Sequence, residues 1–520
     1  MRKWLLIGGA VVVVLFVAAY IVGVTVVAPK LASGARKRTE DYLSKRFKSD
    51  VRIEAFHLSV FPRIHVEVDG IVLRHEGRTD VPPMIQIEKA TFGANWLGLL
   101  GRKADINLVR LDGLQVSLPP RPPGSPPMFK GTDQNLADKY PIVIHEIHAD
   151  NMTLVMLRRA QDSDKPPNTF EIHNLRLQDF TFDKPASFQA MLTNPRPRGV
   201  IHTAGQFGPW QADDPSVTPV EGAYTFQNAD MSTLKGLKGT MQSVGQFRGP
   251  LDYLEVDGET EIPDFALRTS AHAMPLHTDY SAIVDGTNGN TILKNVTARL
   301  LHTTFSVHGE VVDLKKKTKG RTIELYTTSS NARIEDLLTL AVDASPPALI
   351  GPANLNARID IPEGDADLID RMMINGHFGV GHMQFTNAAT QSKVDSLSRR
   401  AQGEPKNDNI ADAPSELKGT FDLSNSRIKM SNLVFAVDGA TIDLAGTYQM
   451  DSGQLDFRGH LKMDAKLSQT TTGVKSLFLK VVDPFFAKHG AGTDLPIKIT
   501  GTKDHPNYGL DLHDKDNTKE

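Results

Sequence analysis

Apolar and polar residues alternate in many short segments of this 520-residue chain, and this pattern restricts the fold more than any other feature. Near the C-terminus, Leu433, Phe435 and Val437 are separated by single residues, and Ile442 and Leu444 repeat the pattern. Successive side chains of a β-strand point to opposite faces, so a period of two predicts a strand with one apolar face. Frequent glycine (41) and proline (31) fit many strands joined by turns. The sequence therefore predicts a mainly β protein.

The predicted strands follow one another closely along the chain, without helices between them. They cover residues 64–68, 71–73, 85–87, 106–110, 114–118, 142–147, 152–157, 174–182, 222–226, 251–262, 280–284, 295–301, 304–312 and 322–327. Further strands are marked by alternating apolar residues: Ile428 and Met430, then Leu433, Phe435 and Val437, then Ile442 and Leu444, then Leu455 and Phe457, then Leu461 and Met463. A last strand pair surrounds residues 497–499 and 510–512. Asp69-Gly70 predicts a turn, and Asp112-Gly113 predicts a hairpin between its flanking strands. This spacing excludes a parallel βαβ fold and predicts a mostly antiparallel meander.

A few helices are predicted as well. Short ones are expected at residues 335–342 and 364–373, and a longer amphipathic helix over 473–490 carries apolar residues at helical spacing: Val474, Leu477, Phe478, Val481, Val482, Phe485 and Phe486. The polar segment 388–416 is expected to be helical in its first part (391–401) and a mobile loop over 403–414. Residues 119–127 are proline-rich and predict an exposed extended loop, either a spacer or a docking site for an aromatic groove.

A single long sheet with one apolar face must cover that face, and the predicted helices are too few to do so. Two architectures stay open: sheets paired as serial sandwiches, or one curled sheet whose apolar floor is covered by lipid acyl chains. Roughly 20 strands at ~4.8 Å spacing would give a groove on the order of 100 Å long. We expect the long, curled, mostly antiparallel sheet with an apolar groove. The groove candidates are Ile428, Met430, Leu433, Phe435, Val437, Ile442, Leu444, Leu455 and Phe457.

Residues 4–28 contain no charged residue, which predicts an N-terminal transmembrane helix. About 20 apolar residues cross a hydrocarbon core of ~30 Å. The run is longer than the apolar region of a signal peptide, so an uncleaved anchor is favoured over a cleaved signal or a buried core helix. Arg2 and Lys3 favour a cytoplasmic N-terminus, whereas the basic residues after the run favour the opposite orientation. The anchor residues include Trp4, Leu15, Phe16, Tyr20 and Val27.

Residues 30–48 predict an amphipathic helix directly after the anchor. Its apolar members are Leu31, Ala35, Tyr42, Leu43 and Phe47, and its charged members include Arg36, Lys37, Arg38, Lys45, Arg46 and Lys48. Such a helix either packs on the first strands or lies on anionic headgroups beside the anchor.

Composition excludes several classes of function. The net charge of −3 argues against a general polyanion binder, so no nucleic acid partner is expected. The absence of cysteine removes disulfides, thiolate catalysis and cysteine-ligated zinc. The sequence has no Gly-x-Ser-x-Gly nucleophile elbow, and Gly379 and Gly381 lack the third glycine and the following helix of a phosphate loop.

Three patterns suggest a metal site and are better explained by ordinary structure. His145 and His148 are three residues apart, whereas the helical zinc motif needs four. Asp257, Glu259 and Glu261 share a strand face, which calcium could use but which a solvated face explains. Residues 285–290 resemble part of a calcium loop without its terminal glutamate, so a turn is favoured. Trp96 and its leucine neighbours are expected in a core rather than against lipid. No catalytic, cofactor or metal site is predicted, and no enzymatic activity.

A series of short motifs runs in a fixed order along most of the chain. They are FKSDVRIEAFHLSVFPR (47–63), VDGIVL (68–73), WLGLL (96–100), VRLDGLQV (109–116), IEDLL (334–338), PPALIG (346–351), QFTN (384–387), LSRRAQG (397–403), GATIDLAG (439–446) and GTDLPIKITG (492–501) with Pro506. In these motifs the chain resembles the AsmA family of bacterial inner-membrane-anchored periplasmic proteins. The family is similar to chorein-like lipid-bridge proteins, so the resemblance implies a long β-groove that moves phospholipid between the two membranes.

The expected organisation follows from the residues and the resemblance together. We expect an anchor (1–29), an AsmA-like helix with the first strands (30–128), a central β-groove (129–387), a polar loop (388–416), AsmA-like C-terminal strands with an amphipathic helix (417–513) and a disordered tail (514–520). The main domain is expected in the periplasm, held to the inner membrane by one span.

The expected function is non-enzymatic phospholipid transport between the inner and outer membranes, contributing to outer-membrane homeostasis. Phospholipids and the inner membrane are the expected partners, with envelope proteins as further candidates. The alternative is a structural or assembly factor for outer-membrane proteins, which would dock partners through residues 119–127 and 388–416. A third hypothesis, an envelope hydrolase, lacks a nucleophile or metal motif.

Overall fold

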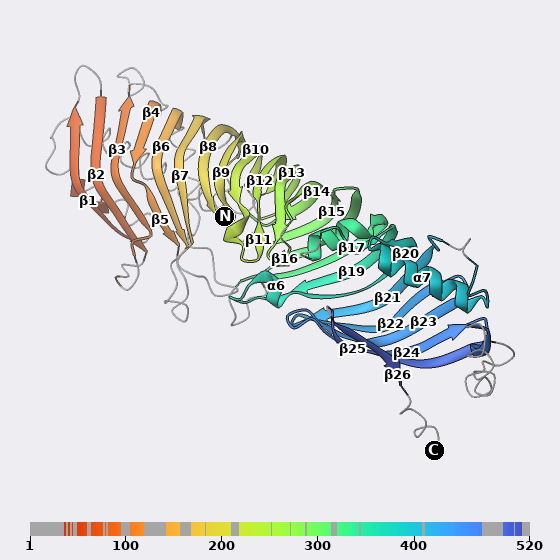
Figure 1. The fold of residues 1–520 in the computed structure, drawn as a ribbon. Helices are drawn as coiled ribbons and strands as arrows, with labels where there is room; N and C mark the ends of the chain where they lie inside the picture. Colours follow the sequence, from red (N-terminus) through yellow and green to blue (C-terminus); the bar gives the residue numbers. More distant parts are fainter. Residues whose placement is uncertain are drawn as a thin grey trace. The chain divides into compact units, whose positions relative to one another are not determined.

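The chain forms one long mixed β-sheet with few helices in the computed structural model (Figure 1). The structure describes residues 36–37, 40–41, 44, 49–59, 64–75, 79, 82–94, 104–118, 142–156, 168–181, 184–209, 218–250, 252–270, 272–286, 289–313, 320–342, 345–407, 411–470, 492–503 and 505–511. They divide into two units. Unit 1 comprises residues 1–233, 241–260 and 281–291, and unit 2 comprises residues 234–240, 261–280 and 292–520.

Unit 1 contains the first ten strands, which form neighbouring rows of the sheet in Figure 1. They are β1 (Ser49–Ser59), β2 (Ile64–His75), β3 (Ile85–Ala94), β4 (Ala104–Asp112), β5 (Gln115–Leu118), β6 (Ile142–Met156), β7 (Asn168–Phe180), β8 (Ala186–Pro195), β9 (Arg198–Phe207) and β10 (Pro219–Asp230), followed by the 3₁₀ turn η3 (Met231–Thr233). Four strands contribute residues to both units: β12 (Thr240–Pro250), β13 (Leu254–Leu267), β14 (Met274–Val284) and β15 (Thr291–Leu300).

Unit 2 contains the remaining elements. They are β11 (Leu237–Lys238), β16 (Thr303–Val312), β17 (Thr322–Arg333), α5 (Ile334–Ala341), β18 (Leu349–Ile350), β19 (Pro352–Ile361), α6 (Leu368–Arg371), β20 (Met373–Phe385), α7 (Ala388–Ala401), β21 (Ser415–Ser424), β22 (Arg427–Val437), β23 (Ala440–Gln449), β24 (Gln454–Met463), η4 (Leu467–Thr470), β25 (Thr493–Thr502) and β26 (Pro506–Leu510). From β20 to β26 each strand pairs antiparallel with the next along the chain.

The Asp69-Gly70 turn predicted from the sequence is wrong, because β2 runs without a break from Ile64 to His75. Gly70 takes a φ of +63°, a left-handed conformation that glycine adopts at no steric cost. This residue changes the phase of the alternation, so that Val68 and Ile71 are both buried in the same core. A dipeptide that often marks a hairpin can therefore also adjust the face of a continuous strand.

The predicted hairpin at Asp112-Gly113 is also wrong. Strands β4 and β5 pair with the same two neighbours, antiparallel with β3 and parallel with β6, so they lie end to end in one row of the sheet. Gly113, with a φ of +64°, stands at the break between them. The pairing of β6 with β4 and β5 makes the sheet mixed, and residues 119–141 supply the long connection that a parallel pair needs.

Several predicted elements are confirmed with shifted ends. The helices α5, α6 and α7 lie where short helical segments were expected, whereas the predicted strands 142–147 and 152–157 are one strand, β6. The expected mobile loop over 403–414 is wrong at its end, because Ala413 is buried and its N–H donates to Asp395 Oδ1 over 3.0 Å. Strands β1, β8, β9, β11, β12, β18, β19, β20 and β21 were not predicted.

The remaining predictions fall outside the described residues. They concern the apolar run 4–28, the Trp96 segment, the proline-rich segment 119–127, the amphipathic helix 473–490 and the tail 514–520. Within the described residues, no helix has both the length and the apolar character that a membrane crossing requires.

Candidate functional site: the apolar face of unit 2

All nine predicted groove residues lie on one face of three neighbouring strands, β22, β23 and β24. In the register of the sheet, Leu433 stands opposite Leu444, and Phe435 stands opposite Ile442. Residues directly opposite each other in an antiparallel pair share a face. The same register joins the other members: Ile428 to Leu455 through Tyr448, Met430 to Phe457 through Gly446, and Val437 at the end of β22.

This face continues over the neighbouring strands, and we call it the apolar face. None of these further members was predicted as a groove residue, although the alternation of Leu461 and Met463 was noted in the sequence and Leu417, Phe421 and Leu423 alternate with polar residues as clearly as the predicted ones do. The additional members are Leu355, Ile359, Ile361, Ile374, Phe378, Val380, Leu417, Phe421, Leu423, Leu461, Met463, Leu495, Ile497, Ile499, Tyr508 and Leu510.

The apolar face is only partly shielded from solvent. Of the nine predicted residues, Val437 and Phe457 are buried and the other seven are half-buried. In unit 1 the corresponding apolar residues of β1 to β7 are sealed, as Leu73 and Ile106 show with 0% exposure. A closed sandwich would bury such side chains between two sheets. The apolar face of unit 2 therefore has the exposure expected of an open binding surface.

Two helices cover one margin of the apolar face, where β20, β22 and β24 end and β21, β23 and β25 begin. Val394 and Ala401 of α7 are buried with Val437, Ala440 and Met463. At the neighbouring strands, Ile334 and Leu337 at the start of α5 pack on Ala332, Ala353, Val380 and Met383. Phe435 contacts both clusters, and its ring lies 6.4 Å from that of Phe385. We call this side the helix-lined margin.

Local sequence features hold α7 in this place. Asn387 caps its N-terminus by accepting a hydrogen bond from Thr390 N at 3.1 Å, and Arg399 and Arg400 suit the negative end of the helix dipole. Gln391 is buried and donates to Asp395 Oδ1 at 3.0 Å. These bonds satisfy polar groups that α7 would otherwise bury without partners.

The opposite margin is formed by tight turns, and we call it the hairpin margin. Its turns include residues 424–427, 449–454 and, among the described residues, 502–503 and 505–506, and they join β21 to β22, β23 to β24 and β25 to β26. Asn425 and Ser426 both have positive φ, as a two-residue hairpin turn requires. At this margin Ile428 and Leu455 are half-buried, and no described helix packs against them.

The other face of the same strands is polar. Lys462 Nζ and Asp443 Oδ2 are 2.6 Å apart, and His460 Nδ1 and Asp494 Oδ1 are 2.8 Å apart. The hydrogen bond to Asp443 raises the pKa of Lys462. Cross-strand ion pairs of this kind are usual on a solvated face. The strands of unit 2 thus separate an apolar face from a charged one.

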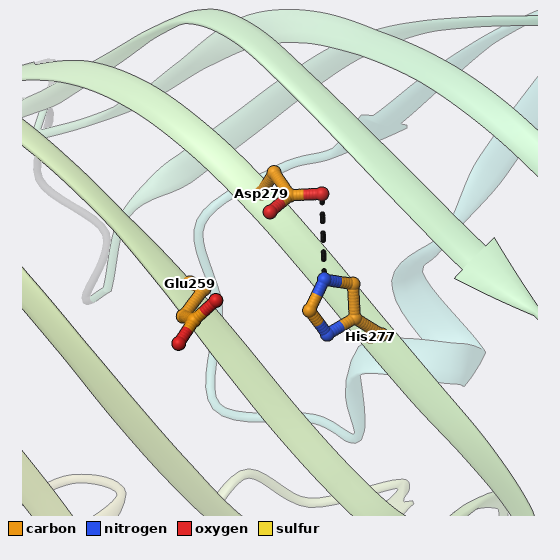
Figure 2. Close-up of side chains that lie close together, drawn as sticks. All are labelled: Glu259, His277 and Asp279. Atoms are coloured by element: carbon orange, nitrogen blue, oxygen red, sulfur yellow. Dashed lines mark ion pairs between the residues drawn. The ribbon is translucent and has the colours of Figure 1, made fainter.

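His277 on β14 lies in a cluster of ion pairs of unit 2. His277 Nδ1 lies 2.5 Å from Glu261 Oε1, and Nε2 lies 3.3 Å from Asp279 Oδ2, the ion pair drawn in Figure 2. Arg299 on β15 contacts the same Asp279 oxygen at 3.0 Å. The hydrogen bond that His277 donates to Glu261 is the main cause that raises the pKa of His277. Glu259, also labelled in Figure 2, belongs to unit 1.

The other sequence-level metal candidates are engaged in ordinary contacts. His145 pairs with Asp179 at 3.3 Å, and His148 pairs with Glu146 at 3.0 Å, so the two imidazoles have separate partners. The carboxylates of Asp257, Glu259 and Glu261 are exposed on β13. Asp285 N donates to Asn290 O at 2.8 Å, and Gly289 N donates to Asp285 O at 2.6 Å, so these backbone groups already have partners.

Similarity to known proteins does not assign a function to this chain. No family model, no curated protein and no solved structure matches this chain. The fold and the geometry of the apolar face are therefore the basis on which a function can be argued.

Proposed function

We propose that this chain is a membrane-anchored lipid-binding protein of the AsmA type, which carries phospholipid between the inner and outer membranes. The observation that supports this most is the half-buried apolar face of unit 2, which runs over at least seven strands, β20 to β26. Exposed apolar surfaces larger than a few hundred Å² mark interaction sites in soluble domains. Each methylene that leaves water on such a surface contributes about 0.8 kcal/mol.

In this proposal the sheet is a groove whose floor is the apolar face. Acyl chains lie on the floor, and the charged face of the same strands contacts water. The uncharged run 4–28 holds the chain at the bacterial inner membrane, with the main domain in the periplasm. Binding without bond chemistry needs no catalytic residue, metal or cofactor, and it contributes to outer-membrane homeostasis through lipid supply.

Lipid analysis of purified protein tests the proposal. The full chain is purified in mild detergent, and bound phospholipid is identified by mass spectrometry. Replacement Leu444→Asp places a charge on the floor, where Leu444 is half-buried, and should remove most of the bound phospholipid while the strand content stays unchanged. Thr447→Asp, on the opposite face of the same strand, is the matched control and should retain lipid. A native chain free of phospholipid would refute the proposal.

The alternative of an assembly factor has less support from the structure. One of its two docking segments, 388–416, is packed against the sheet, since Val394, Ala401 and Ala413 are all buried. A docking segment would present such residues to a partner instead.

A further inference from the structure

The two margins of the apolar face differ in how far they shield it. At the helix-lined margin, Met383 is 1% exposed and Met463 is 6% exposed, because α5 and α7 pack over the strand ends. At the hairpin margin, Ile428, Tyr448 and Leu455 are half-buried. An elongated ligand on this face would contact α5 and α7 at the helix-lined margin, which we also call the wall. At the hairpin margin it would contact solvent.

The length of the apolar face between the hairpin margin and the wall is sufficient for one extended acyl chain. Along β23, the floor runs from Tyr448 at the hairpin margin to Ile442, which stands opposite Phe435 of the wall. These residues are six positions apart, which is about 20 Å at ~3.3 Å per residue. The hydrocarbon of one bilayer leaflet is about 15 Å deep, half of the ~30 Å core. A chain laid along the strands fits between the open margin and Phe435.

Two aromatic side chains lie where the apolar face reaches the helix-lined margin. Phe435 contacts residues of both helix-packed clusters, and Phe385 lies 6.4 Å from it. The apolar end of an acyl chain can contact these rings without removing a polar group from water. A charged headgroup at the same place would lose its hydration, which costs free energy. The wall therefore suits chain ends and excludes headgroups.

The turns of the hairpin margin offer polar partners instead. Exposed Arg427 and Lys503 carry positive charge, and Arg427 Nε also donates to Gln449 Oε1 at 3.1 Å. Exposed Asp451 carries negative charge and interacts electrostatically with Arg268. A zwitterionic headgroup contains a phosphate, which could pair with Arg427 and Lys503, and an ammonium group, which could pair with Asp451.

We infer that bound phospholipid lies along the strands of unit 2 with its headgroup at the hairpin margin and its chain ends against Phe435 and α7. This orientation rests on the proposed function and adds to it the side from which lipid enters and leaves. Lipid exchange takes place at the turns 424–427 and 449–454, and α7 closes the opposite side.

Two photoreactive phosphatidylethanolamines test the orientation on the native full chain in mild detergent. One carries a diazirine on the headgroup, and the other carries it at the end of an acyl chain. After irradiation, labelled peptides are located by mass spectrometry. The headgroup probe should label residues 424–427 and 449–454 severalfold more than residues 438–440 and 464–466. The chain-end probe should show the reverse bias and should label β22 near Phe435.

The outcomes separate the orientation from the function. Labelling by both probes that is reversed, or equal at the two margins, overturns the orientation and leaves lipid binding intact. No labelling above the unirradiated control, by either probe, overturns the proposed function and the orientation with it. Leu444→Asp serves as a specificity control, since labelling on the floor should be lost in that variant.

Discussion

The backbone N–H of Ile53 in β1 donates a hydrogen bond to Glu40 Oε1 over 2.8 Å. Ser44 accepts a second bond from Val51 N at 3.1 Å, and Arg36 donates to Glu54 O at 3.0 Å. The three side chains are spaced four residues apart and therefore share one face of a helix. They occupy backbone groups of β1 that would otherwise be free to pair with another strand. For these residues, the structure favours packing on the first strands over contact with headgroups.

Removing this protection should cause self-association. In the double variant Glu40→Ala and Ser44→Ala, two backbone donors of β1 lose their partners, each at a net cost of about 1 kcal/mol. We expect larger species in light scattering coupled to size exclusion, at concentrations where the native chain gives one peak. Asp41→Ala changes an exposed neighbour and is the control. An unchanged elution of the double variant would show that β1 does not need these side chains.

Phe435 and Ile428 should differ in their contribution to stability although both lie on β22 and on the same face. Phe435 contacts the clusters under α5 and α7, so Phe435→Ala leaves a cavity and should lower the free energy of unfolding by about 3 kcal/mol. Ile428 is half-buried at the open margin, and Ile428→Ala should cost about 1 kcal/mol. Urea denaturation of both variants measures the difference. Equal losses would indicate that the hairpin margin is as closed as the wall.

Asp336 should anchor α5 to the sheet. Its buried carboxylate accepts hydrogen bonds from His302 N at 3.0 Å and from Thr303 Oγ1 at 2.8 Å. Asp336→Ala leaves both donors unsatisfied, which should cost about 1–3 kcal/mol and increase amide exchange in α5 and at the start of β16. Asp336→Asn keeps one acceptor oxygen and should restore part of the protection. Exchange rates equal to those of the native chain would refute this role.

His277 should make stability depend on pH near neutrality. Its pKa is raised above the ordinary 6.5, chiefly by the hydrogen bond to Glu261 and further by Asp279. A raised pKa in the folded state means that the contribution is complete below the unfolded-state pKa and is lost as the pH rises through the folded-state pKa. The Tm of the native chain should therefore fall, relative to His277→Gln, between pH ~6 and pH ~8.

An NMR titration checks the cause of that dependence. The imidazole of His277 should titrate above its ordinary value in the native chain, and Glu261→Gln should lower the midpoint. Asp443→Asn removes a distant ion pair of the same unit, with Lys462, and should leave the midpoint unchanged. A midpoint that does not respond to Glu261→Gln would remove Glu261 as the cause.

The sequence alone determined which residues share a face. The alternation of Leu433, Phe435 and Val437 places them on one side of β22, because successive side chains of a strand point in opposite directions. The helical spacing around Leu337 likewise predicted α5. Both features depend on local geometry that a few neighbouring residues fix.

Only the tertiary structure decided how the strands are joined and what lies over them. Asp112-Gly113 is compatible with a hairpin or with a break in a continuous row, and the pairing of β4 and β5 with β6 selected the second. Alternating apolar residues are sealed in unit 1, as at Leu73, and half-open in unit 2, as at Leu444. The period of two is the same in both cases. It depends on the direction in which each side chain points from the strand, and not on whether another part of the protein packs over that side chain.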